Sequence, residues 1–408
     1  MKPLALILAL AGALWHRPAH ACGGCTAPPD TITSVDSHRM VISLSPTRTI
    51  LWDQIRYTGE PDDFAWILPV PTPEATLAIA SSAFFDELEW QTQVNVQAPP
   101  LPSPDCPPPP WGNSGGQDGA PALDAGVDVY REEVVGPYET AVIGSSDAGA
   151  LYALLHAHNY EVTADARPVF EYYIARGSVF IVLRLAPQQG VSAMQPVRVT
   201  YPGYMSTFPL KMVTVGAYAQ LDLTLWVYAE QRYAAHNYGT AVIDPADLVW
   251  DFATGQSNYR ALFATAVESL GGRGWVAEYA QGAGQLWFSA DGAVEAELAR
   301  QAIPAAFVTR LRTSARVEHL VDDLVLAPAQ DSGPINNFLS TQNAINVPPT
   351  PPCPDYNNDG RPDTWADYYA SRHDGFLCTI GLARRSLPFS VAAIAIFGLV
   401  VWRTRRRR

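Results

Sequence analysis

The chain has 408 residues, of which 48% are hydrophobic, and its 11 tryptophans and 18 tyrosines exclude a disordered surface protein. Its net charge of −13 understates the acidity of the central region, because seven of the 27 basic residues lie in the first 21 and the last six positions, where no acidic residue occurs. The central region therefore has 20 basic and 40 acidic residues. This balance excludes nucleic acid as its partner, since phosphate binding requires clustered cations.

An export signal opens the chain. Lys2 is followed by an apolar stretch and by a small-x-small tripeptide that ends at Ala21. This order of basic, apolar and small residues is typical of a cleaved signal peptide. We predict that residues 1–21 are removed by cleavage between Ala21 and Cys22, so that the rest of the chain is exported.

Five cysteines in an oxidising compartment leave one unpaired. Cys353 and Cys378 bracket a polar segment, and we predict a local disulfide between them. For the other three, two arrangements remain open. Cys22 and Cys25 form a disulfide and Cys106 is free, or Cys22 is lipidated and Cys25 pairs with Cys106. The residues before Cys22 lack the aliphatic residue of a bacterial lipobox, and the prolines after Cys25 are atypical of a redox C-x-x-C motif.

The central region alternates many strand-like runs with few helical ones. Runs rich in β-branched and aromatic residues predict strands at 40–44, 49–57, 64–70, 127–130, 138–143, 169–174, 179–185, 197–201, 208–215, 221–228, 307–311 and 324–326. Apolar residues at helical spacing predict helices at 81–91, 146–158, 257–270 and 293–300. We predict an α+β fold, strand-dominated, with mostly antiparallel sheets and a few short helices, plus a C-terminal transmembrane helix.

Two proline-rich segments delimit this region. Residues 99–121 form an irregular Pro/Gly loop, and residues 330–354 are rich in Asn, Ser, Thr and Pro. Proline keeps such a segment extended and semi-rigid. We expect an ectodomain at 22–329 and a proline-rich stalk at 330–354.

A calcium-loop pattern follows the predicted stalk. It reads D-x-N-x-D-G-x-x-D, with oxygen side chains at alternate positions and glycine at the sixth. It is similar to the calcium loops of thrombospondin type 3 repeats, and it lacks the glutamate that ends an EF-hand loop. We predict a structural Ca²⁺ site within a disulfide-closed segment at 355–386, with Asp355, Asn357, Asp359, Arg361, Asp363 and Asp367 as its residues.

The C-terminal segment is apolar and ends in arginines. Residues 387–402 are apolar or small, and five arginines lie within 403–408. Sixteen residues make about 24 Å of helix, which is shorter than the roughly 30 Å hydrocarbon core, so a buried core helix is the competing interpretation. The arginines favour a transmembrane helix at 387–402 with a cytoplasmic tail at 403–408.

Aromatic residues offer a possible ligand surface. Tryptophans can stack on sugars, but at strand positions we expect them to pack in the core; they are Trp52, Trp66, Trp90, Trp226, Trp250, Trp275 and Trp287. The sequence has no H-E-x-x-H, G-x-S-x-G or Walker motif. No reaction is therefore indicated.

Three stretches resemble the bacterial DUF2330 family. They are the C-G-G-C at 22–25, the segment QIRYTGEPDDFAWILPVP at 54–71 and VTRLRT at 308–313. The resemblance covers roughly residues 20–330. It implies an envelope location and no established reaction, so it assigns no catalytic residue. The C-terminal segment separately resembles the tripartite sorting signals of some Gram-negative bacteria, which implies processing to the cell surface.

We expect a non-enzymatic protein of the cell envelope, a single-pass membrane protein with an extracytoplasmic body. Its role would be binding, structure or assembly, with a protein or polysaccharide partner that the sequence leaves open. The alternative is an extracytoplasmic hydrolase of envelope polymers with unassigned catalytic carboxylates. A cleft that gathers acids with shifted pKa values would favour the hydrolase, and an exposed apolar patch would favour binding.

Overall fold

The computed structural model describes residues 25–26, 34–58, 65–101, 134–157, 166–186, 193–215, 217, 219–301, 303, 306–350, 352–355, 361–362 and 364–365. The chain divides into two compact units. One comprises residues 1–99 and 125–347, and the other comprises residues 100–124 and 348–408. All the strands and α-helices below belong to the first unit.

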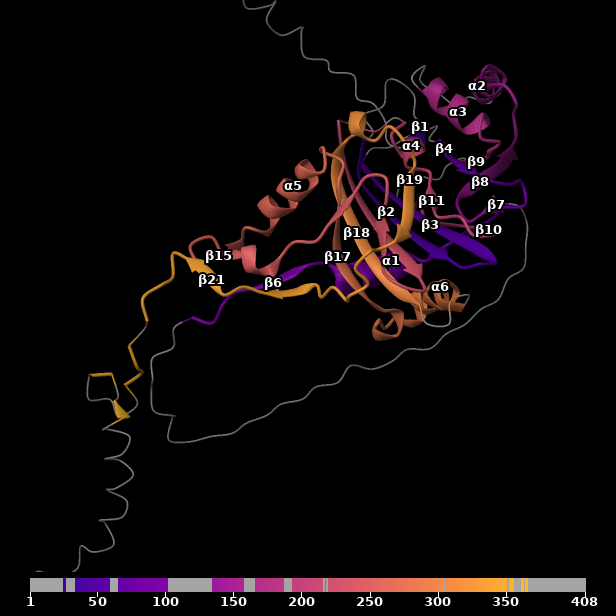
Figure 1. The fold of residues 1–408 in the computed structure, drawn as a ribbon. Helices are drawn as coiled ribbons and strands as arrows, with labels where there is room; N and C mark the ends of the chain where they lie inside the picture. Colours follow the sequence, from indigo (N-terminus) through magenta and orange to yellow (C-terminus); the bar gives the residue numbers. More distant parts are fainter. Residues whose placement is uncertain are drawn as a thin grey trace, which may run out of the picture. The chain divides into compact units, whose positions relative to one another are not determined.

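An eight-stranded sheet forms the centre of this unit (Figure 1). In spatial order its strands are β14 (Thr240–Ala241), β17 (Trp275–Gly282), β18 (Phe307–Arg316), β12 (Gln220–Ala229), β2 (Ser34–Leu44), β3 (Arg48–Thr58), β10 (Val197–Pro202) and β5 (Thr76–Ile79). Neighbours run antiparallel except β12 with β2 and β14 with β17, which are parallel. The prediction of mostly antiparallel sheets is confirmed.

Strand β12 shows why both faces of this sheet are buried. Leu223 and Leu225 point to one face and belong to one apolar core, whereas Trp226 and Tyr228 point to the opposite face and belong to another. This alternation follows from the two-residue period of a strand. The second core is covered by α1 (Ser82–Thr92) and α6 (Ala290–Gln301), which pack against each other.

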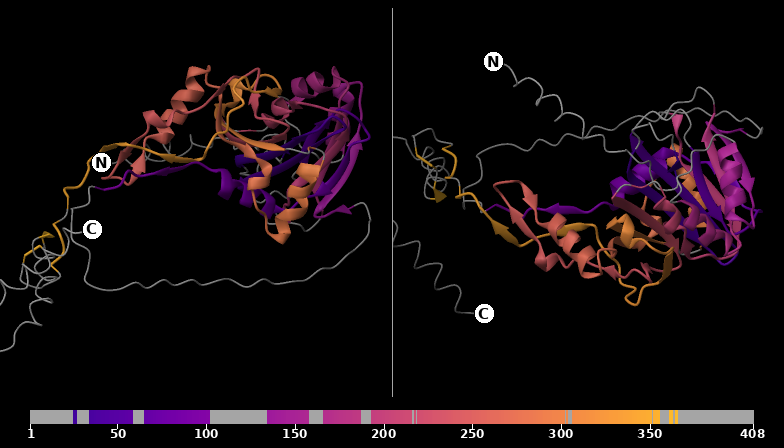
Figure 2. Two further views of the ribbon diagram at one scale, coloured as in Figure 1. Left: turned by 60° about the horizontal axis from the view of Figure 1, so that its bottom comes forward. Right: turned by 90° about the horizontal axis from the view of Figure 1, so that it is seen from above.

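A five-stranded antiparallel sheet lies next to the central one. Its order is β1 (Cys25–Thr26), β4 (Ala65–Val70), β9 (Val179–Leu185), β8 (Tyr138–Ile143) and β7 (Val134–Val135). One face packs on residues of β10, and the other packs on α2 (Ala148–Ala157) and α3 (Arg167–Ile174). Figure 2 shows these two helices in magenta on the same side of the unit as the strands of this sheet.

Small sheets complete the unit. Their strands are β6 (Asn95–Gln97), β11 (Thr207–Phe208), β13 (Tyr233–Ala235), β15 (Val249–Asp251), β16 (Gln256–Ser257), β19 (Leu324–Pro328), β20 (Phe338–Ser340) and β21 (Asn343–Ile345). They form the sets β11-β19-β13, β16-β15-β21 and β20-β6. Three 3₁₀ turns, Pro245–Asp247, Ala283–Gln285 and Val317–His319, occur in the described part of the chain.

The compact unit extends beyond the predicted stalk boundary at residue 329. Ile335 exchanges backbone hydrogen bonds with Ala280, β20 pairs with β6, and β21 pairs with β15. The physical reason is that the stretch between Pro334 and Pro348 contains no proline, so its N–H groups can join sheets. Residues 335–345 are therefore part of the folded body and not of an extended stalk.

The four predicted helices are confirmed as α1, α2, α5 (Tyr259–Ser269) and α6. Asp147 accepts a hydrogen bond from the backbone N–H of Ala150 at the start of α2, as its sequence position predicts. At α1 the capping residue is Ser81, whose hydroxyl accepts from the backbone N–H of Ala83.

The predicted strand at 169–174 is wrong, because this segment is α3. Its composition is strand-like, but Pro168 occupies the first turn, where proline is preorganised for a helix. Phe170 and Tyr173 lie three residues apart and are the buried pair of this helix. Tertiary packing of that face outweighs the β propensity of Val, Phe and Tyr.

Two further predictions need correction. Only Phe208 of the predicted strand 208–215 is in a strand, β11 (Thr207–Phe208), and Pro209 then caps the short helix α4 (Leu210–Val213). Strand β17 was not predicted, because its Ala, Glu and Gly residues are poor strand formers. Its position inside the sheet, between β14 and β18, keeps it extended. The predicted strand at 127–130 lies outside the described residues.

Candidate functional site: a groove beside helix α5

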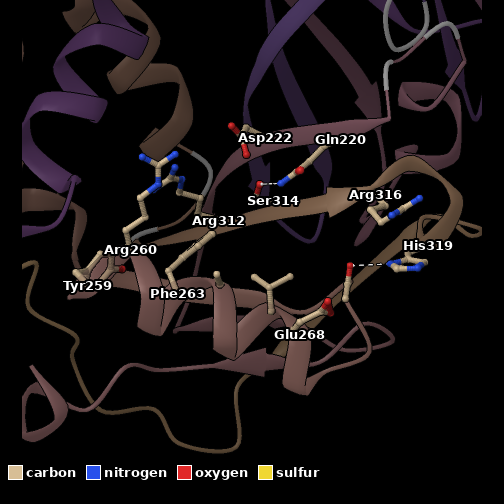
Figure 3. A pocket seen from close by; sticks show the side chains of 13 residues that line it. Gln220, Asp222, Tyr259, Arg260, Phe263, Glu268, Arg312, Ser314, Arg316 and His319 are labelled. Carbon is tan, nitrogen blue, oxygen red and sulfur yellow. Dashed lines mark hydrogen bonds between the residues drawn. The ribbon is translucent and has the colours of Figure 1, made fainter.

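A groove of about 820 Å³ opens between α5 and the central sheet, and we name it the α5 groove (Figure 3). Its floor consists of alternate residues on two paired strands. Gln220 and Asp222 come from β12, and Arg312, Ser314 and Arg316 come from β18. Alternate residues of a strand point to one face, so these polar side chains share the face that the groove exposes. Gln220 Nε2 donates to Ser314 Oγ at 2.7 Å.

The wall of the groove is one side of α5. Phe263 and Val267, four residues apart, pack on Val276 of β17 and hold the helix against the sheet. Arg260 and Glu268 lie beside this apolar stripe and line the groove. The sequence therefore fixes both the position of the helix and the side that it presents to the groove.

Two glycines follow α5, and the second of them, Gly272, lines the groove. Gly271 and Gly272 follow α5 with φ angles of 77° and 69°, a conformation that favours glycine. His319 Nδ1 lies 3.1 Å from the carbonyl oxygen of Gly272. A Cβ at position 272 would lie 2.7 Å from His319 Nδ1 and 2.9 Å from Glu268 Oε2. The close approach of these side chains therefore requires glycine at this position.

Positively charged and donor side chains occupy both ends of the groove. Figure 3 shows Arg260 and Arg312 toward one end and Arg316 and His319 toward the other. Three guanidinium groups and an imidazole thus line one groove in a chain with a net charge of −13.

The three arginines differ in how they are held. Arg312 lies over the ring of Phe263, 4.8 Å from its centroid, and its Nη1 is 3.7 Å from Glu278 Oε1. Arg316 forms an exposed ion pair of 2.8 Å with Glu318. The side chain of Arg260 forms no ion pair or hydrogen bond with any other described residue. Arg260 is therefore available to a ligand without displacing a carboxylate.

A buried ion network supports the floor of the groove. Arg310 Nε donates to Glu278 Oε2 at 2.8 Å, and its Nη2 donates to Glu89 Oε1 at 2.7 Å. Tyr259 donates to the other oxygen of Glu278 at 2.9 Å. Burial raises the pKa of Tyr259, and the charge of Glu278 raises it further. Burial lowers the pKa of Arg310, but the two carboxylates outweigh this effect and leave the pKa raised, so its charge is retained.

Comparison with known families decides the identity of the chain. A family model described as "Uncharacterized protein conserved in bacteria (DUF2330)" matches residues 17–327. The chain belongs to the DUF2330 family. No curated protein matches the sequence. Among solved structures, a crystal structure of baculovirus P35 is similar with a TM-score of 0.28 and 11% identity, covering 50% of this chain and 67% of that chain. A similarity this low carries no argument.

Within this DUF2330 chain, residues 65–70 of the resemblance segment 54–71 form β4 and lie against a buried histidine–aspartate pair. His38 Nε2 of β2 pairs with Asp53 of β3, and both residues are about 1% exposed. Trp66–Pro69 line the same small cavity as this pair. No other described residue forms a hydrogen bond with His38 Nδ1. The pair is enclosed and is not part of the α5 groove.

Most residues of the predicted calcium site lie outside the described part of the chain. Of its six residues, only Asp355 and Arg361 are described. The described residues include no group of three His, Cys, Asp or Glu side chains that could hold a metal ion. The Ca²⁺ site therefore stays a prediction.

The predictions for the disulfides and for the two ends of the chain also stay predictions. Cys353 is disulfide-bonded, but its predicted partner Cys378 lies outside the described residues. Cys25 is described as part of β1, whereas Cys22, Cys106 and the predicted cleavage site after Ala21 are not. The predicted transmembrane helix at 387–402 and the sorting signal also lie outside. Among the residues that are described, no helix is long and apolar enough to span a membrane.

The seven tryptophans differ in burial: four are buried, Trp250 of β15 is half-buried, and two are exposed. Trp52, Trp66, Trp226 and Trp275 are buried, as expected for strand positions. Trp90 and Trp287 do not follow that expectation, because their exposed fractions are 65% and 59%. They lie close to each other and line a second groove, which is separate from the α5 groove.

Sequence reasoning did not find the α5 groove. Its floor comes from β12 and β18, whose groove residues are about ninety positions apart, and only the pairing of these strands joins them. A partial signal was present, since the resemblance motif at 308–313 includes Arg312 and the predicted helix 257–270 ends at the two glycines. Neither observation indicated that the two segments line one groove.

Proposed function

We propose that this DUF2330 protein is a binding protein of the bacterial cell envelope, exported by its signal peptide and anchored by its C-terminal segment. We propose further that the α5 groove binds an anionic ligand. The observation that carries this proposal is the gathering of Arg260, Arg312 and Arg316 in one solvent-open groove of ligand size. Guanidinium groups bind carboxylates and phosphates through two parallel hydrogen bonds.

The surroundings of the groove strengthen the case for an anion. The central region has twice as many acidic as basic residues, so arginines without acidic partners are scarce. Asp222 and Glu268 also line the groove and would repel an anion locally. Glu268 lies close to His319, because a Cβ at position 272 would contact both side chains. An anion is therefore expected to bind near Arg260 and Arg312, at the end of the groove opposite His319.

Binding is favoured over hydrolysis by the environment of the acidic residues. Hydrolases of polymers use paired carboxylates, of which one has a raised pKa. Burial raises the pKa of the Asp323 carboxyl group. Asp323 is buried behind hydrogen bonds and does not line the α5 groove. This observation supports the binding role over the alternative hydrolase.

Isothermal titration calorimetry of the mature chain in mild detergent tests the proposal. Inorganic pyrophosphate and citrate are the probes, and the sodium chloride concentration is varied. We expect binding that weakens with salt. Arg260→Gln should weaken it about tenfold or more, because hydrogen bonds to charged groups contribute roughly 1.5–3 kcal/mol. Arg167→Gln is the control, because Arg167 is exposed on α3 and lies outside the groove.

Two results would contradict the proposal. One is that the wild-type protein binds neither anion at any salt concentration. The other is that Arg260→Gln binds the anions as tightly as the wild type and the control Arg167→Gln do.

A further inference from the structure

A second groove, of about 440 Å³, is lined in part by residues at the end of α1 and the start of β6. Figure 1 labels these two elements. Seven amide side chains, four aromatic rings and one leucine line the groove, and no charged side chain does. We name it the Trp–amide groove. In a chain whose central region is strongly acidic, a groove lined without a carboxylate is a distinct chemical environment.

Three large aromatic side chains are exposed at this groove. The exposed fraction is 65% for Trp90, 59% for Trp287 and 55% for Phe338. The rings of Trp90 and Trp287 have centroids 5.7 Å apart and an interplanar angle of 70°. Apolar surface gathered in this way on a soluble domain marks an interaction site more often than chance exposure does.

Hydrogen bonds hold Trp287 in place even though its ring is exposed. Gln91 Nε2 donates to the carbonyl oxygen of Trp287 at 2.7 Å, and Gln91 Oε1 accepts from the backbone N–H of Trp287 at 3.0 Å. The amide of Gln91 therefore pairs with both backbone groups of Trp287, and it joins α1 to a segment almost two hundred residues away. The Trp–amide groove thus does not depend on a ligand for its position.

A buried asparagine fixes the opposite side of the groove. Asn337 Nδ2 donates to the carbonyl oxygens of Gln91 and Gln93, each at 2.9 Å, and the N–H of Asn95 donates to the carbonyl of Asn337 at 2.8 Å. Asn337 is 3% exposed. These bonds attach the segment that carries Phe338 to the C-terminal end of α1. The aromatic rings on both sides are therefore preorganised, which reduces the ordering that binding requires.

Four other amides of the groove are available. The side chains of Gln93, Asn95, Gln281 and Gln285 form no hydrogen bond with another described residue. Each amide offers both donors and an acceptor. A sugar hydroxyl is also both donor and acceptor, so uncharged amides match it without imposing a charge. A charged group that entered this groove would lose solvation and find no counter-charge.

We propose that the Trp–amide groove binds a neutral carbohydrate, such as a segment of an uncharged polysaccharide. The tryptophan and phenylalanine rings pack against the C–H faces of the sugar rings, and the free amides bind the hydroxyls. This inference is independent of the anion site, because the two grooves share no residue.

Affinity electrophoresis of the mature chain in mild detergent tests the inference. Native gels contain one soluble polysaccharide each: dextran, galactomannan and xylan as neutral probes, and alginate and hyaluronate as anionic ones. We expect at least one neutral polysaccharide to retard the wild-type protein. Trp287→Ala and Trp90→Ala should each raise the dissociation constant for that polysaccharide about tenfold or more, as is usual for a central aromatic contact. Both rings are exposed, so circular dichroism should show unchanged folding.

Matched variants separate a binding site from a general effect. Tyr204→Ala removes another exposed aromatic ring, half exposed and outside the groove, and should leave retardation unchanged. Trp287→Phe keeps an aromatic surface and should restore part of the retardation lost in Trp287→Ala. Arg260→Gln should not change retardation by neutral polysaccharides, which distinguishes this site from the α5 groove.

The inference is overturned by any of three results. Neutral polysaccharides fail to retard the wild-type protein, or only the anionic ones retard it, or the two tryptophan variants are retarded as strongly as the wild type is.

Discussion

Tyr173 donates a hydrogen bond of 2.5 Å to Oδ1 of Asp323 and so connects α3 to the residue before β19. The same Oδ1 accepts from the backbone N–H of Lys211 at 3.1 Å, and the Tyr173 hydroxyl accepts from the N–H of Met212 at 3.0 Å. Both partners belong to α4. Three elements from distant parts of the chain therefore meet at one phenol and one carboxylate, both buried.

Replacing Tyr173 by Phe should destabilise the protein by about 1–3 kcal/mol. The substitution removes the tyrosine donor from the buried Asp323 carboxylate, and losing a hydrogen bond to a buried charged group costs about this much. It also removes one of the two acceptors of the Met212 N–H, which keeps its 3.2 Å bond to the carbonyl oxygen of Pro209. Denaturant unfolding followed by tryptophan fluorescence measures the change. Tyr152→Phe is the control, because the Tyr152 hydroxyl bonds no other described residue and should change the stability by less than about 0.5 kcal/mol. Equal losses of stability in Tyr173→Phe and Tyr152→Phe would show that the hydrogen bond between Tyr173 and Asp323 does not stabilise the protein.

The ionisation of Asp323 should make stability depend on pH. Burial raises the pKa of its carboxyl above 3.8, and the hydrogen bonds from Tyr173 and Lys211 offset only part of this. A raised folded-state pKa means that the folded protein binds the proton more tightly than the unfolded chain does. The stabilising contribution is therefore complete below pH 3.8 and is lost as the pH rises through the folded-state pKa.

Comparison with Asp323→Asn isolates this contribution. Asn keeps an oxygen acceptor but does not titrate. As the pH falls from 7 toward 3.8, the wild type should gain stability relative to the variant, by at most about 1.4 kcal/mol per pH unit for one proton. Urea midpoints measured at several pH values test this. If the difference in stability between the wild type and Asp323→Asn stays constant with pH, or changes in the opposite direction, the ionisation of Asp323 does not cause the pH dependence.

The elements that the sequence predicted well have simple periodicity. Strand β12 reads Leu-Asp-Leu-Thr-Leu at its start, and its alternation matches its observed burial. Strand β17 and helix α3 were missed or misassigned, because each takes its conformation from its neighbours. Ala and Glu in β17 are held extended by the strands on both sides, and Phe170 and Tyr173 in α3 fit the space over β9.

The candidate sites were harder to predict than the fold. Trp90 and Trp287 are 197 positions apart in the sequence and approach each other where Gln91 pairs with the backbone of Trp287. Composition identified many tryptophans but not which of them are exposed. A local helical pattern places Trp90 on α1, yet only the tertiary structure shows that its ring lies outside the apolar core that α1 covers.

The ion network below the α5 groove should contribute strongly to stability. Arg310 and Glu278 are 3% and 1% exposed, so replacing Arg310 by Met leaves a buried carboxylate without its main partner. We expect a loss of about 3–5 kcal/mol, since breaking a buried pair leaves a charge uncompensated. Arg167→Gln breaks an exposed pair with Glu171 and should cost less than about 1 kcal/mol. Chemical denaturation measures the free energy of unfolding of both variants. Similar losses of stability in the two would contradict the prediction.

The two glycines after α5 allow the shape of the groove to be tested apart from backbone strain. Both have positive φ angles, but a Cβ at Gly271 meets no atom within 4 Å, whereas one at Gly272 would clash with His319 and Glu268. Gly271→Ala and Gly272→Ala should each lose about 1–2 kcal/mol of stability, because alanine disfavours this backbone region. Only Gly272→Ala should also displace His319. Because the anion is expected near Arg260 and Arg312 at the opposite end of the groove, the affinity for pyrophosphate should stay unchanged in both variants. Titration calorimetry tests this, and weaker binding in Gly272→Ala alone would place the anion next to His319.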